Sequence, residues 1–380
     1  MIEFQSATKR FPDGTVAVRE LDLTVEAGTI TVFVGPSGCG KTTSLRMVNR
    51  MVEPTSGTVL VDGVDVLSSD PARLRRGIGY VIQHAGLFPH RTVLDNIATV
   101  PLLSGWTRRK ARSRAAELLE LVGLAGELGS RYPAQLSGGQ QQRVGVARAL
   151  AADPPVLLMD EPFSAVDPVV REGLQDELLR LQNDLDKTVV FVTHDIDEAV
   201  RIGERVAVFA EGGRLAQYVA PAELLASPAD DFVADFVGRD RGYRGLSFLP
   251  ASDLALGEVA TTEVGATRGG LSAEASAEDW VLVLDGDRRP RGWLAPDSPW
   301  RRDRDAGELA ESDLVAGGSL HTDGGALRGA LDAALSAPSG LGVVVDDSGR
   351  YRGVITPSRV LDLVERRRSK RGGPSAGATT

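Results

Sequence analysis

Short apolar runs separated by turn residues mark the strands that the N-terminal half of the chain predicts. Residues 29–34 form a β-rich run that ends in glycine, and residues 59–63 predict a strand that enters a turn. The runs 156–159 and 188–192 are almost wholly apolar. Such runs are typical of central strands in a parallel sheet, because both faces of these strands are covered.

Apolar residues with helical spacing lie between these runs. They recur on one face over residues 108–122, and a second helical pattern covers residues 138–152 before an Asp-Pro-Pro sequence. Further helices are predicted at residues 44–52 and at 169–185, the latter between the two most apolar strands. The order strand, helix, strand predicts an α/β domain.

The pattern changes near Gly238, beyond which small residues become frequent and a weak internal repeat begins. Residues 283–296 match residues 344–357 at an offset of about 61 positions, and each copy predicts strand, turn, strand. Two copies are too few for a solenoid, which needs three or more. We therefore expect a pseudo-twofold pair of small modules that pack on each other.

Composition sets limits on the class of protein. The 380 residues suggest two or three domains, and 42% hydrophobic with 25% charged residues is typical of globular chains. The net charge of −9 counts against nucleic acid as the main partner. The single cysteine, Cys39, excludes an intramolecular disulfide framework and a multi-cysteine zinc site, and it fits a reducing, intracellular location. The chain has no signal-peptide pattern and no run near the ~18 apolar residues that span a bilayer, so we expect any role at a membrane to depend on partners.

The strongest chemical signal is a phosphate-binding pattern, G-x-x-x-x-G-K-[ST], at residues 35–43, which we call the phosphate loop. Its glycines let successive backbone N–H groups turn toward phosphates, and the following helix adds its dipole. Lys41 is expected to contact the β- and γ-phosphates, and Thr42 to offer its hydroxyl to Mg²⁺. An ordinary glycine-rich turn is the alternative, and the position between a strand and a helix disfavours it. The nucleotide-contacting residues predicted here are Gly35, Ser37, Gly38, Cys39, Gly40, Lys41, Thr42 and Thr43.

A pair of carboxylates ends the apolar strand 156–159. Consecutive side chains at a strand end point in different directions, so one can hold Mg²⁺ while the other faces the nucleophile. We assign Asp160 to the metal and Glu161 to the base that polarises the attacking water. Taken alone, this pattern is more typical of a strand that enters a solvated turn, and the phosphate loop is what favours function.

Three other residues have candidate roles that follow from their positions relative to the predicted strands and helices. His194 comes directly after the strand 188–192, at the sheet edge where ligands bind, from which it can reach a γ-phosphate. Ser137 opens the helix 138–152, and its spacing favours a simple N-cap, with a second anion-binding site as the alternative. Cys39 lies just ahead of a helix N-terminus, a position that favours the thiolate.

Together, these motifs resemble the ATP-binding subunit of an ABC transporter. Residues 35–43 resemble Walker A, residues 136–140 the ABC signature, residues 156–160 Walker B, residues 164–167 the D-loop, and His194 the switch histidine. The order and spacing match over residues 1–239. The resemblance implies a P-loop NTPase cassette with a RecA-like core and a helical subdomain, and ATP and Mg²⁺ as cofactors.

The resemblance also assigns residues that spacing alone does not. Gln83 takes the Q-loop position, where it would contact Mg²⁺ and the reacting water, and Phe11 the position of the aromatic residue that stacks on adenine. Two cassettes of such proteins meet head to tail, so Ser137, Gly139 and the D-loop residue Asp167 would contact nucleotide across a homodimer. The partners implied are integral-membrane permease subunits and, through them, an extracytoplasmic binding protein. The location implied is the cytoplasmic face of the cell membrane.

Within the family, residues 79–90 are most similar to importers of glycine betaine, choline, carnitine and related quaternary amines. The C-terminal repeat resembles the paired CBS modules of many such subunits, a smaller α+β domain. Those modules carry Thr or Ser followed three residues later by Asp; here the second copy has Thr356 and Arg359, and the first has Ala295 and Ser298. A folded spacer or dimerising module is therefore favoured over a nucleotide sensor in this domain.

The resulting organisation is a cassette at 1–239, a linker at 240–254, a tandem CBS-like domain at 255–370 and a disordered tail at 371–380. The basic run 366–371 predicts a solvated helix end, with attraction to anionic lipid as the alternative. Three alternative functions stay open at this point: an importer cassette for another small solute, a soluble ABC ATPase of DNA repair or translation, and a CBS-based nucleotide sensor. The last two are disfavoured, because the chain has one cassette without long coiled-coil insertions, and because Glu161 and His194 are intact.

Overall fold

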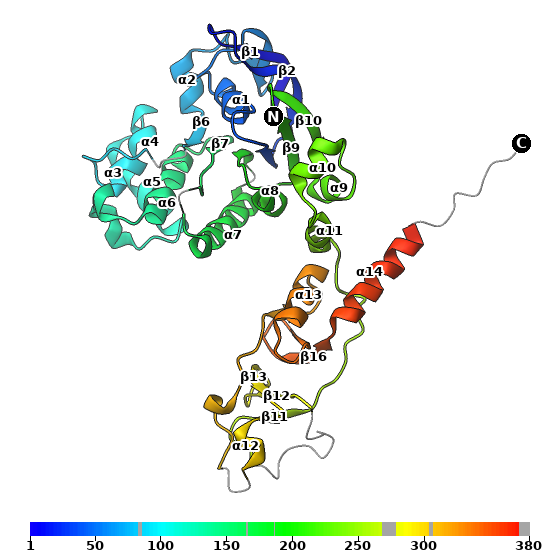
Figure 1. Ribbon diagram of the computed structural model, residues 1–380. Helices are drawn as coiled ribbons and strands as arrows, with labels where there is room; N and C mark the ends of the chain where they lie inside the picture. Colours follow the sequence, from blue (N-terminus) through cyan, green and yellow to red (C-terminus); the bar gives the residue numbers. More distant parts are fainter. Residues whose placement is uncertain (83–85, 165, 186, 268–278, 304–306, 372–380) are drawn as a thin grey trace, which may run out of the picture. The chain divides into compact units, whose positions relative to one another are not determined.

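The computed structural model describes the chain except for residues 83–85, 165, 186, 268–278, 304–306 and 372–380 (Figure 1). The chain divides into two compact units, Met1–Arg239 and Asp240–Thr380. Among the described residues, no helix is both long enough and apolar enough to cross a membrane.

The first unit is built on a six-stranded sheet with the order β10-β9-β3-β8-β7-β6. Its strands are β3 (Ile30–Val34), β6 (Ile78–Val81), β7 (Val156–Asp160), β8 (Thr188–Val192), β9 (Arg205–Ala210) and β10 (Arg214–Val219). β10 pairs antiparallel with β9, and every other pair in this sheet is parallel. All residues of β3, β7 and β8 are buried, so the prediction of central strands in a parallel sheet is confirmed.

A second, antiparallel sheet has the order β2-β1-β4-β5. Its strands are β1 (Ile2–Arg10), β2 (Val16–Val25), β4 (Ser56–Val61) and β5 (Val64–Asp65). One hydrophobic cluster joins the two sheets and includes Phe4, Phe33, Leu45 and Val190. Because Leu45 belongs to helix α1 (Lys41–Val48), this helix contributes to the core that the two sheets share.

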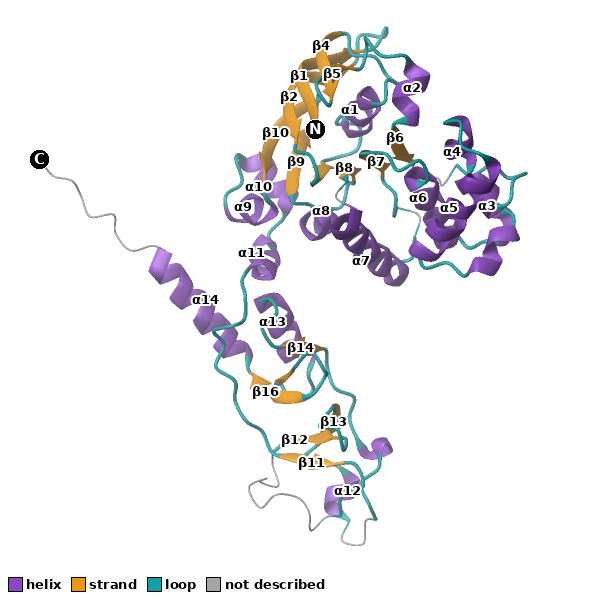
Figure 2. Ribbon diagram, turned by 180° about the vertical axis from the view of Figure 1, so that it is seen from behind, coloured by secondary structure: helices purple, strands orange, loops and turns teal. Residues whose placement is uncertain are grey.

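The first unit also contains helices α2 (Pro71–Arg76), α3 (Val93–Ile97), α4 (Thr99–Leu103), α5 (Arg108–Leu121), α6 (Gly138–Leu150), α7 (Pro168–Leu185), α8 (Ile196–Ile202), α9 (Pro221–Ala226) and α10 (Asp231–Val237), with 3₁₀ turns at Gly126–Ser130 and Pro133–Gln135. Most of these helices pack on a second hydrophobic cluster over β3, β7 and β8, whereas Leu74 of α2 packs against the first cluster and α4 contacts α5 and α6. Figure 2 shows α3 to α6 gathered on one side of the unit, away from β1 and β2. The helices predicted over 108–122, 138–152 and 169–185 are confirmed to within a few residues at their ends.

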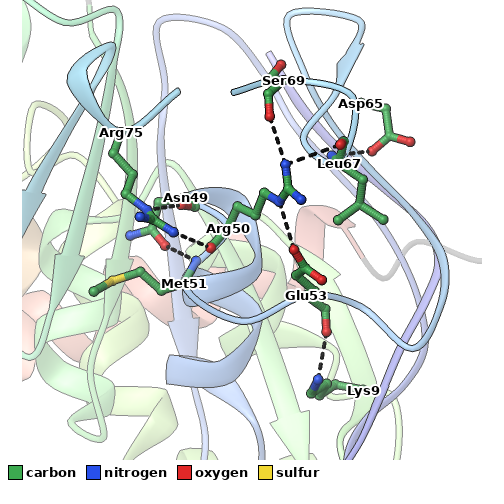
Figure 3. Close-up of polar contacts among 9 residues, drawn as sticks. All are labelled: Lys9, Asn49, Arg50, Met51, Glu53, Asp65, Leu67, Ser69 and Arg75. Carbon is green, nitrogen blue, oxygen red and sulfur yellow. Dashed lines mark hydrogen bonds and ion pairs between the residues drawn. The ribbon is translucent and has the colours of Figure 1, made fainter. Parts of the chain in front are cut away.

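Helix α1 differs from the predicted span 44–52, because it begins at Lys41 and ends at Val48. Asn49 is its C-cap and Arg50 has a φ of 52°, a left-handed conformation that stops a helix. Figure 3 shows how the side chain of Arg50 holds this turn, through Nε to Glu53 Oε1 (2.9 Å) and one terminal nitrogen to Ser69 O (2.8 Å). Arg75 donates to Arg50 O (2.7 Å), so the end of α1 is tied to α2 and to the loop after β5.

The second unit contains two three-stranded sheets with the same connectivity. The first has β11 (Thr261–Glu263), β12 (Val281–Leu284) and β13 (Pro290–Leu294); the second has β14 (Leu320–Thr322), β15 (Gly342–Val345) and β16 (Tyr351–Ile355). In each sheet the first strand is parallel and the third antiparallel to the middle strand. Asp285 and Asp346 make matching turns, in which each carboxylate accepts from the backbone N–H two and four residues ahead. The two predicted hairpins are therefore present.

The two copies exchange edge segments. Val315, which precedes the second copy, pairs with Trp293 on β13, and Gly257, which precedes the first copy, pairs with Val354 on β16. The approach is close, because a Cβ on Gly292 or Gly353 would lie 2.9 Å from the carbonyl oxygen of Val315 or Gly257, respectively. Buried apolar side chains from both copies form one cluster: Leu282, Leu284, Trp293, Val343, Val345 and Val354.

Residues 240–254, expected to be a linker, belong to the second unit. They form α11 (Arg241–Gly245) and a 3₁₀ turn (Leu246–Phe248), and Leu246 and Ala251 are buried against α13 (Leu327–Ser336) and α14 (Pro357–Arg371). A short helix, α12 (Pro299–Arg302), and a 3₁₀ turn at Glu311–Asp313 also belong to the described part of the unit. The predicted tail begins at 371, whereas α14 runs to Arg371; residues 372–380 lie outside the described chain.

Candidate functional site

The candidate site lies where three adjacent parallel strands end. β3 leads into the phosphate loop, β8 leads into residues 193–195, and β7 ends at Asp160 and leads into Glu161. The backbone connects these ends: the N–H of Thr193 donates to Phe33 O (3.1 Å), and the N–H of Glu161 donates to Val192 O (2.9 Å). The carboxyl ends of parallel strands are where ligands bind in α/β proteins.

The phosphate loop needs glycine at its two ends. Gly35 has a φ of 151° and Gly40 a φ of 97°, and a Cβ would lie 2.2 Å from Phe209 O at the first and 2.0 Å from Ala17 O at the second. Between them, Ser37 and Gly38 are exposed, and the space beside Gly38 is open for at least 4 Å. The loop is therefore a backbone cradle that opens outward, as phosphate binding requires.

Lys41 lies inside this cradle. Its side chain is buried, and Nζ donates to Gly35 O (2.8 Å) and Pro36 O (2.9 Å). Both acceptors are neutral carbonyls, whereas a phosphate oxygen carries negative charge and would add a Coulomb attraction to the ammonium group. The ammonium group is thus held ready for an anion at the mouth of the loop.

Thr42 and Asp160 come together from positions 118 residues apart in the sequence. Thr42 Oγ1 donates to Asp160 Oδ1 (2.8 Å), while Oδ2 of Asp160 is 3.6 Å from the Arg46 guanidinium and accepts from Tyr80 Oη at 3.4 Å. Burial raises the pKa of the Tyr80 hydroxyl, and the hydrogen bond to Tyr80 raises the pKa of Arg46. Hydroxyl and carboxylate oxygens are the ligands that Mg²⁺ prefers, and this ion needs only a few protein ligands when phosphates supply the rest.

Cys39 does not fit the expectation of a thiolate. Its side chain is 1% exposed, and burial raises the pKa of the thiol, even though Sγ is 3.7 Å from Lys41 Nζ. Desolvation therefore outweighs the effect of the neighbouring Lys41 ammonium group. Cys39 still forms part of the loop wall beside Gly35.

Glu161 and His194 face each other across the end of the sheet. His194 Nδ1 lies 3.3 Å from Glu161 Oε1, with side-chain exposures of 59% and 22%. Glu161 has a φ of 46°, a conformation that is uncommon for a residue with a side chain, and Ser164 Oγ donates to its carbonyl oxygen (3.0 Å). The two side chains line a cavity of about 40 Å³, which has room for water.

Phe11 lies in the turn between β1 and β2, and its ring is 36% exposed with Lys9 Nζ 5.3 Å from the ring centre. This hairpin touches the phosphate loop, because Ala17 of β2 lies directly against Gly40. Figure 1 shows β1 and β2 beside α1, the helix that follows the loop. Phe11 is therefore partly open to solvent, in a hairpin whose second strand contacts the phosphate loop.

The signature residues are placed differently. Ser137 caps α6 in a capping box with Gln140, and both Ser137 and Gly138 are exposed while Gly139 is partly so. The N-cap prediction for Ser137 is confirmed. Asp167 is exposed at the start of α7, where its carbonyl oxygen accepts from Arg171 N (2.8 Å). Gln83 lies outside the described residues.

Tyr80, Arg46, Gln175 and Glu198 are among the residues that the structure brings to the site without a role predicted from the sequence. Tyr80 and Arg46 contact Asp160, and Gln175 and Glu198 lie behind His194. Helical spacing contained part of this signal, because Arg46 is four residues after Thr42 on α1. The pairing of Gln175 with Glu198 depends on tertiary contact and had no local signal.

The ABC transporter family model matches residues 18–164. Two relatives are similar over nearly the whole chain. The glycine betaine/carnitine/choline transport ATP-binding protein OpuCA of Bacillus subtilis is 38% identical over 372 residues, 96% of each chain. The osmoprotectant import ATP-binding protein OsmV of Salmonella typhimurium is 40% identical over 381 residues, 98% of each chain.

A solved structure is similar to the first unit. It is the dimeric ATP-binding cassette MJ0796 in a post-hydrolysis state bound to ADP and Pi, with a TM-score of 0.54 and 34% identity. The match covers 58% of this chain and 99% of that chain. Since the phosphate loop and the carboxylates of β7 lie at the same sheet edge, and since the relatives share nearly the full length, the chain belongs to the ABC transporter family as one of its ATP-binding cassette proteins.

Proposed function

We propose that this chain is the ATP-hydrolysing subunit of an importer of quaternary-amine osmoprotectants such as glycine betaine, choline and carnitine. The observation that carries the proposal is similarity over nearly the whole chain, second unit included, to two proteins named for the import of such solutes. Cassettes of many transporters share the first unit, so the extent of the match is what favours this solute class.

In the proposed site, the cradle of Gly35, Ser37, Gly38, Cys39 and Gly40 binds ATP phosphates through backbone N–H groups. Lys41 exchanges its two loop carbonyls for phosphate oxygens, and Thr43 adds a hydroxyl at the first turn of α1. Phe11 stacks on the base. The close fit of Gly40 against Ala17 supports this arrangement, because it places the hairpin of Phe11 next to the loop.

Mg²⁺ bound to ATP would neutralise charge on the phosphates. The residues that would hold it are Thr42, Asp160 and Gln83. The 2.8 Å contact between Thr42 and Asp160 supports the fit, since it already brings two oxygen donors together. Tyr80 and Arg46 keep the second oxygen of Asp160 occupied, which fixes the direction in which the first one points.

For hydrolysis, Glu161 takes the proton of the attacking water and His194 contacts the γ-phosphate and orients Glu161. The strained backbone at Glu161 and the 3.3 Å contact between the two side chains support these roles. The small cavity beside them would hold the water, and Gln83 would complete its surroundings.

The working form we propose is a homodimer of cassettes. Ser137, Gly139 and Asp167 would contact the nucleotide bound by the partner cassette. The exposure of the capping box at Ser137 and of Asp167 supports this, and a structurally similar cassette was solved as a dimer. Closure of such a dimer would bury both nucleotides.

We further propose that the dimer binds permease subunits at the cytoplasmic face of the cell membrane, and through them an extracytoplasmic binding protein. The segment that follows Gln83 presents apolar side chains to solvent: Phe88 is 41% exposed and Leu103 63% exposed. Such exposed apolar groups are typical of protein interfaces. We propose that nucleic acid is not a partner.

The second unit is proposed to be a tandem CBS domain that regulates or dimerises the transporter. The identical strand order and the matching turns at Asp285 and Asp346 support a duplicated module. Its boundaries are proposed at residues 240–371, so that the former linker is included.

The test is uptake into proteoliposomes that contain the chain with its permease and binding protein. We expect Mg²⁺- and ATP-dependent uptake of labelled glycine betaine, competed by choline or carnitine. A matched reconstitution with Glu161→Gln serves as the control. Absence of quaternary-amine uptake by an assembly that hydrolyses ATP would overturn the solute class, and absence of Mg²⁺-dependent ATP hydrolysis would overturn the function as a whole.

A further inference from the structure

Behind His194 lies a buried carboxylate that the proposed chemistry does not use. Glu198 is 6% exposed, and each of its carboxylate oxygens accepts a hydrogen bond from a different element. Thr193 Oγ1 donates to Oε2 (2.6 Å), and Gln175 Nε2 of α7 donates to Oε1 (3.1 Å). A buried carboxylate is costly unless its partners are well placed, so this arrangement calls for a reason.

We propose that Glu198 is a positioning residue that fixes the turn carrying His194 and ties it to the helix that follows the D-loop. The proposal rests on the proposed hydrolysis at Glu161 and His194, and it adds residues outside that machinery. Through this link, the orientation of His194 would depend on the position of α7.

The first step is the grip on the turn. Thr193 Oγ1 donates its proton to Glu198, and the same oxygen accepts from Asp195 N (3.0 Å). The residues on both sides of His194 are therefore held by one hydroxyl whose direction Glu198 sets. His194 Nδ1 in turn lies 3.3 Å from Glu161.

The second step is the connection to α7. Gln175 belongs to α7, which begins directly after Asp167, and Figures 1 and 2 both show α7 next to α8. Arg171 adds a parallel connection: it donates to Val166 O (3.2 Å) ahead of α7 and lies 3.9 Å from Asp195 Oδ2. Movement of residues 166–167 would thus be transmitted to the turn 193–195 through two side chains.

A purely local role does not account for this geometry. Glu198 is the third residue of α8 after its cap, Asp195, where a capping-box glutamate would accept from the N–H of the cap residue. That N–H donates to Thr193 Oγ1 instead, and the cap of α8 is made by Asp195 itself, which accepts from Asp197 N (2.8 Å). The Glu198 carboxylate instead accepts hydrogen bonds from Thr193 and Gln175.

The experiment compares four variants of the full-length chain: Glu198→Ala and Thr193→Val, which remove the link, and Glu198→Gln and Thr193→Ser, which can keep it. We expect the first pair to lower kcat for ATP by about tenfold or more while KM changes less than about twofold, since misplaced catalytic groups cost rate rather than binding. The second pair should stay within about threefold of wild type. The double variant Glu198→Ala with Thr193→Val should have a kcat no lower than that of the less active single variant, because both substitutions remove the same link.

Arg201→Gln is the matched control. Arg201 also joins α8 to α7, through Asp176 (2.8 Å), but on the surface and away from the turn. It should keep wild-type kcat. A loss with Arg201→Gln equal to that with Thr193→Val would overturn the proposal in favour of general α7–α8 packing, and so would wild-type kcat with Thr193→Val, a variant that keeps the volume of the side chain.

A readout without turnover separates this proposal from the proposed function. The imidazole resonances of His194, assigned by their loss in His194→Gln, should shift in Thr193→Val and Glu198→Ala and stay unchanged in Arg201→Gln. If wild type fails to hydrolyse ATP, the proposed function fails, and these shifts still decide whether Glu198 positions His194. Unchanged His194 resonances in Thr193→Val would refute the positioning role.

Discussion

The imidazole Nδ1 of His194 lies 3.3 Å from the carboxylate Oε1 of Glu161, at the ends of two adjacent parallel strands. This pairing suits a base that must hold one orientation toward a water molecule. Replacement of Glu161 by Gln keeps the size and the hydrogen-bonding shape of the side chain but removes its ability to accept the proton.

Glu161→Gln should therefore keep ATP binding and lower turnover by about 100-fold or more, the range typical of a lost general base. A stable ATP-bound dimer should be visible by size-exclusion chromatography, because ATP at both interfaces is no longer consumed. Turnover within a few-fold of wild type would remove Glu161 from the role of base.

Phe11→Ala should weaken nucleotide affinity by an amount equivalent to about 1–3 kcal/mol, with little preference among bases, because every base offers a face for stacking. Phe11→Tyr is the matched control and should keep wild-type affinity. Titration with fluorescent ATP and GTP analogues gives the answer, and equal affinities of wild type and Phe11→Ala would mean that the ring only packs in its hairpin.

Cys39 should react slowly with alkylating reagents in the folded chain. Its raised pKa keeps the thiol protonated at neutral pH, and burial blocks access, so the labelling rate should rise with pH and should rise strongly in urea. MgATP should slow labelling further by closing the loop. Fast labelling at pH 7 in the folded state would show that the loop opens more often than its packing suggests.

The pH dependence of stability should report on Glu198. Burial raises the pKa of its carboxyl and Asp195 adds to this, while Thr193, Gln175 and Arg171 oppose it. The folded state therefore binds this proton more tightly than the unfolded state does, so the group's contribution to stability is complete below the unfolded pKa and is lost as the pH rises through the folded pKa. Glu198→Gln should therefore gain in Tm relative to wild type between acidic and neutral pH; a Tm difference that is independent of pH would contradict the shift.

A chain that ends at Arg239 should still bind and hydrolyse ATP, because all proposed nucleotide contacts lie in the first unit.

If the run 366–371 binds anionic lipid, uptake should respond to salt in the full chain, since the Debye length falls from about 30 Å at 0.01 M to about 8 Å at 0.15 M. The variant to compare replaces Arg366, Arg368, Lys370 and Arg371 by Ser and Gln and spares Arg367. Arg367 is spared because it binds Asp253 (2.6 Å) and Pro250 O within its own unit. Identical salt curves for full chain, truncation and variant would exclude the lipid contact.

Local patterns were enough to predict the central strands and the phosphate loop. Apolar runs such as 188–192 and the glycines at 35 and 40 each encode their own conformation, because burial on two faces and a positive φ leave few residue types that fit. The predicted C-terminal end of α1 lay too far along the chain, because no sequence pattern indicates that Arg50 adopts a left-handed turn held by Glu53 and Ser69.

Predictions that depend on solvation or on distant contacts were harder to make. A helix N-terminus favours a thiolate, but the sequence does not state that Cys39 is covered, and burial decided its pKa. Residues 240–254 lacked a strong periodicity and suggested a linker, yet Leu246 and Ala251 pack against α13 and α14, which begin only at Leu327 and Pro357. Contacts of that kind are set by tertiary packing.

The exchange of edge segments between the two copies also has a consequence for how the second unit forms. The edge strand of the first copy, β13, is paired only when Val315 has been synthesised. The edge strand of the second copy, β16, pairs with Gly257, which is synthesised before either copy. A chain cut between the copies would leave both halves with a bare strand edge, the surface from which proteins aggregate or swap segments. The two halves of the repeat are therefore expected to fold and unfold together, and neither is a module that could be moved or deleted by itself.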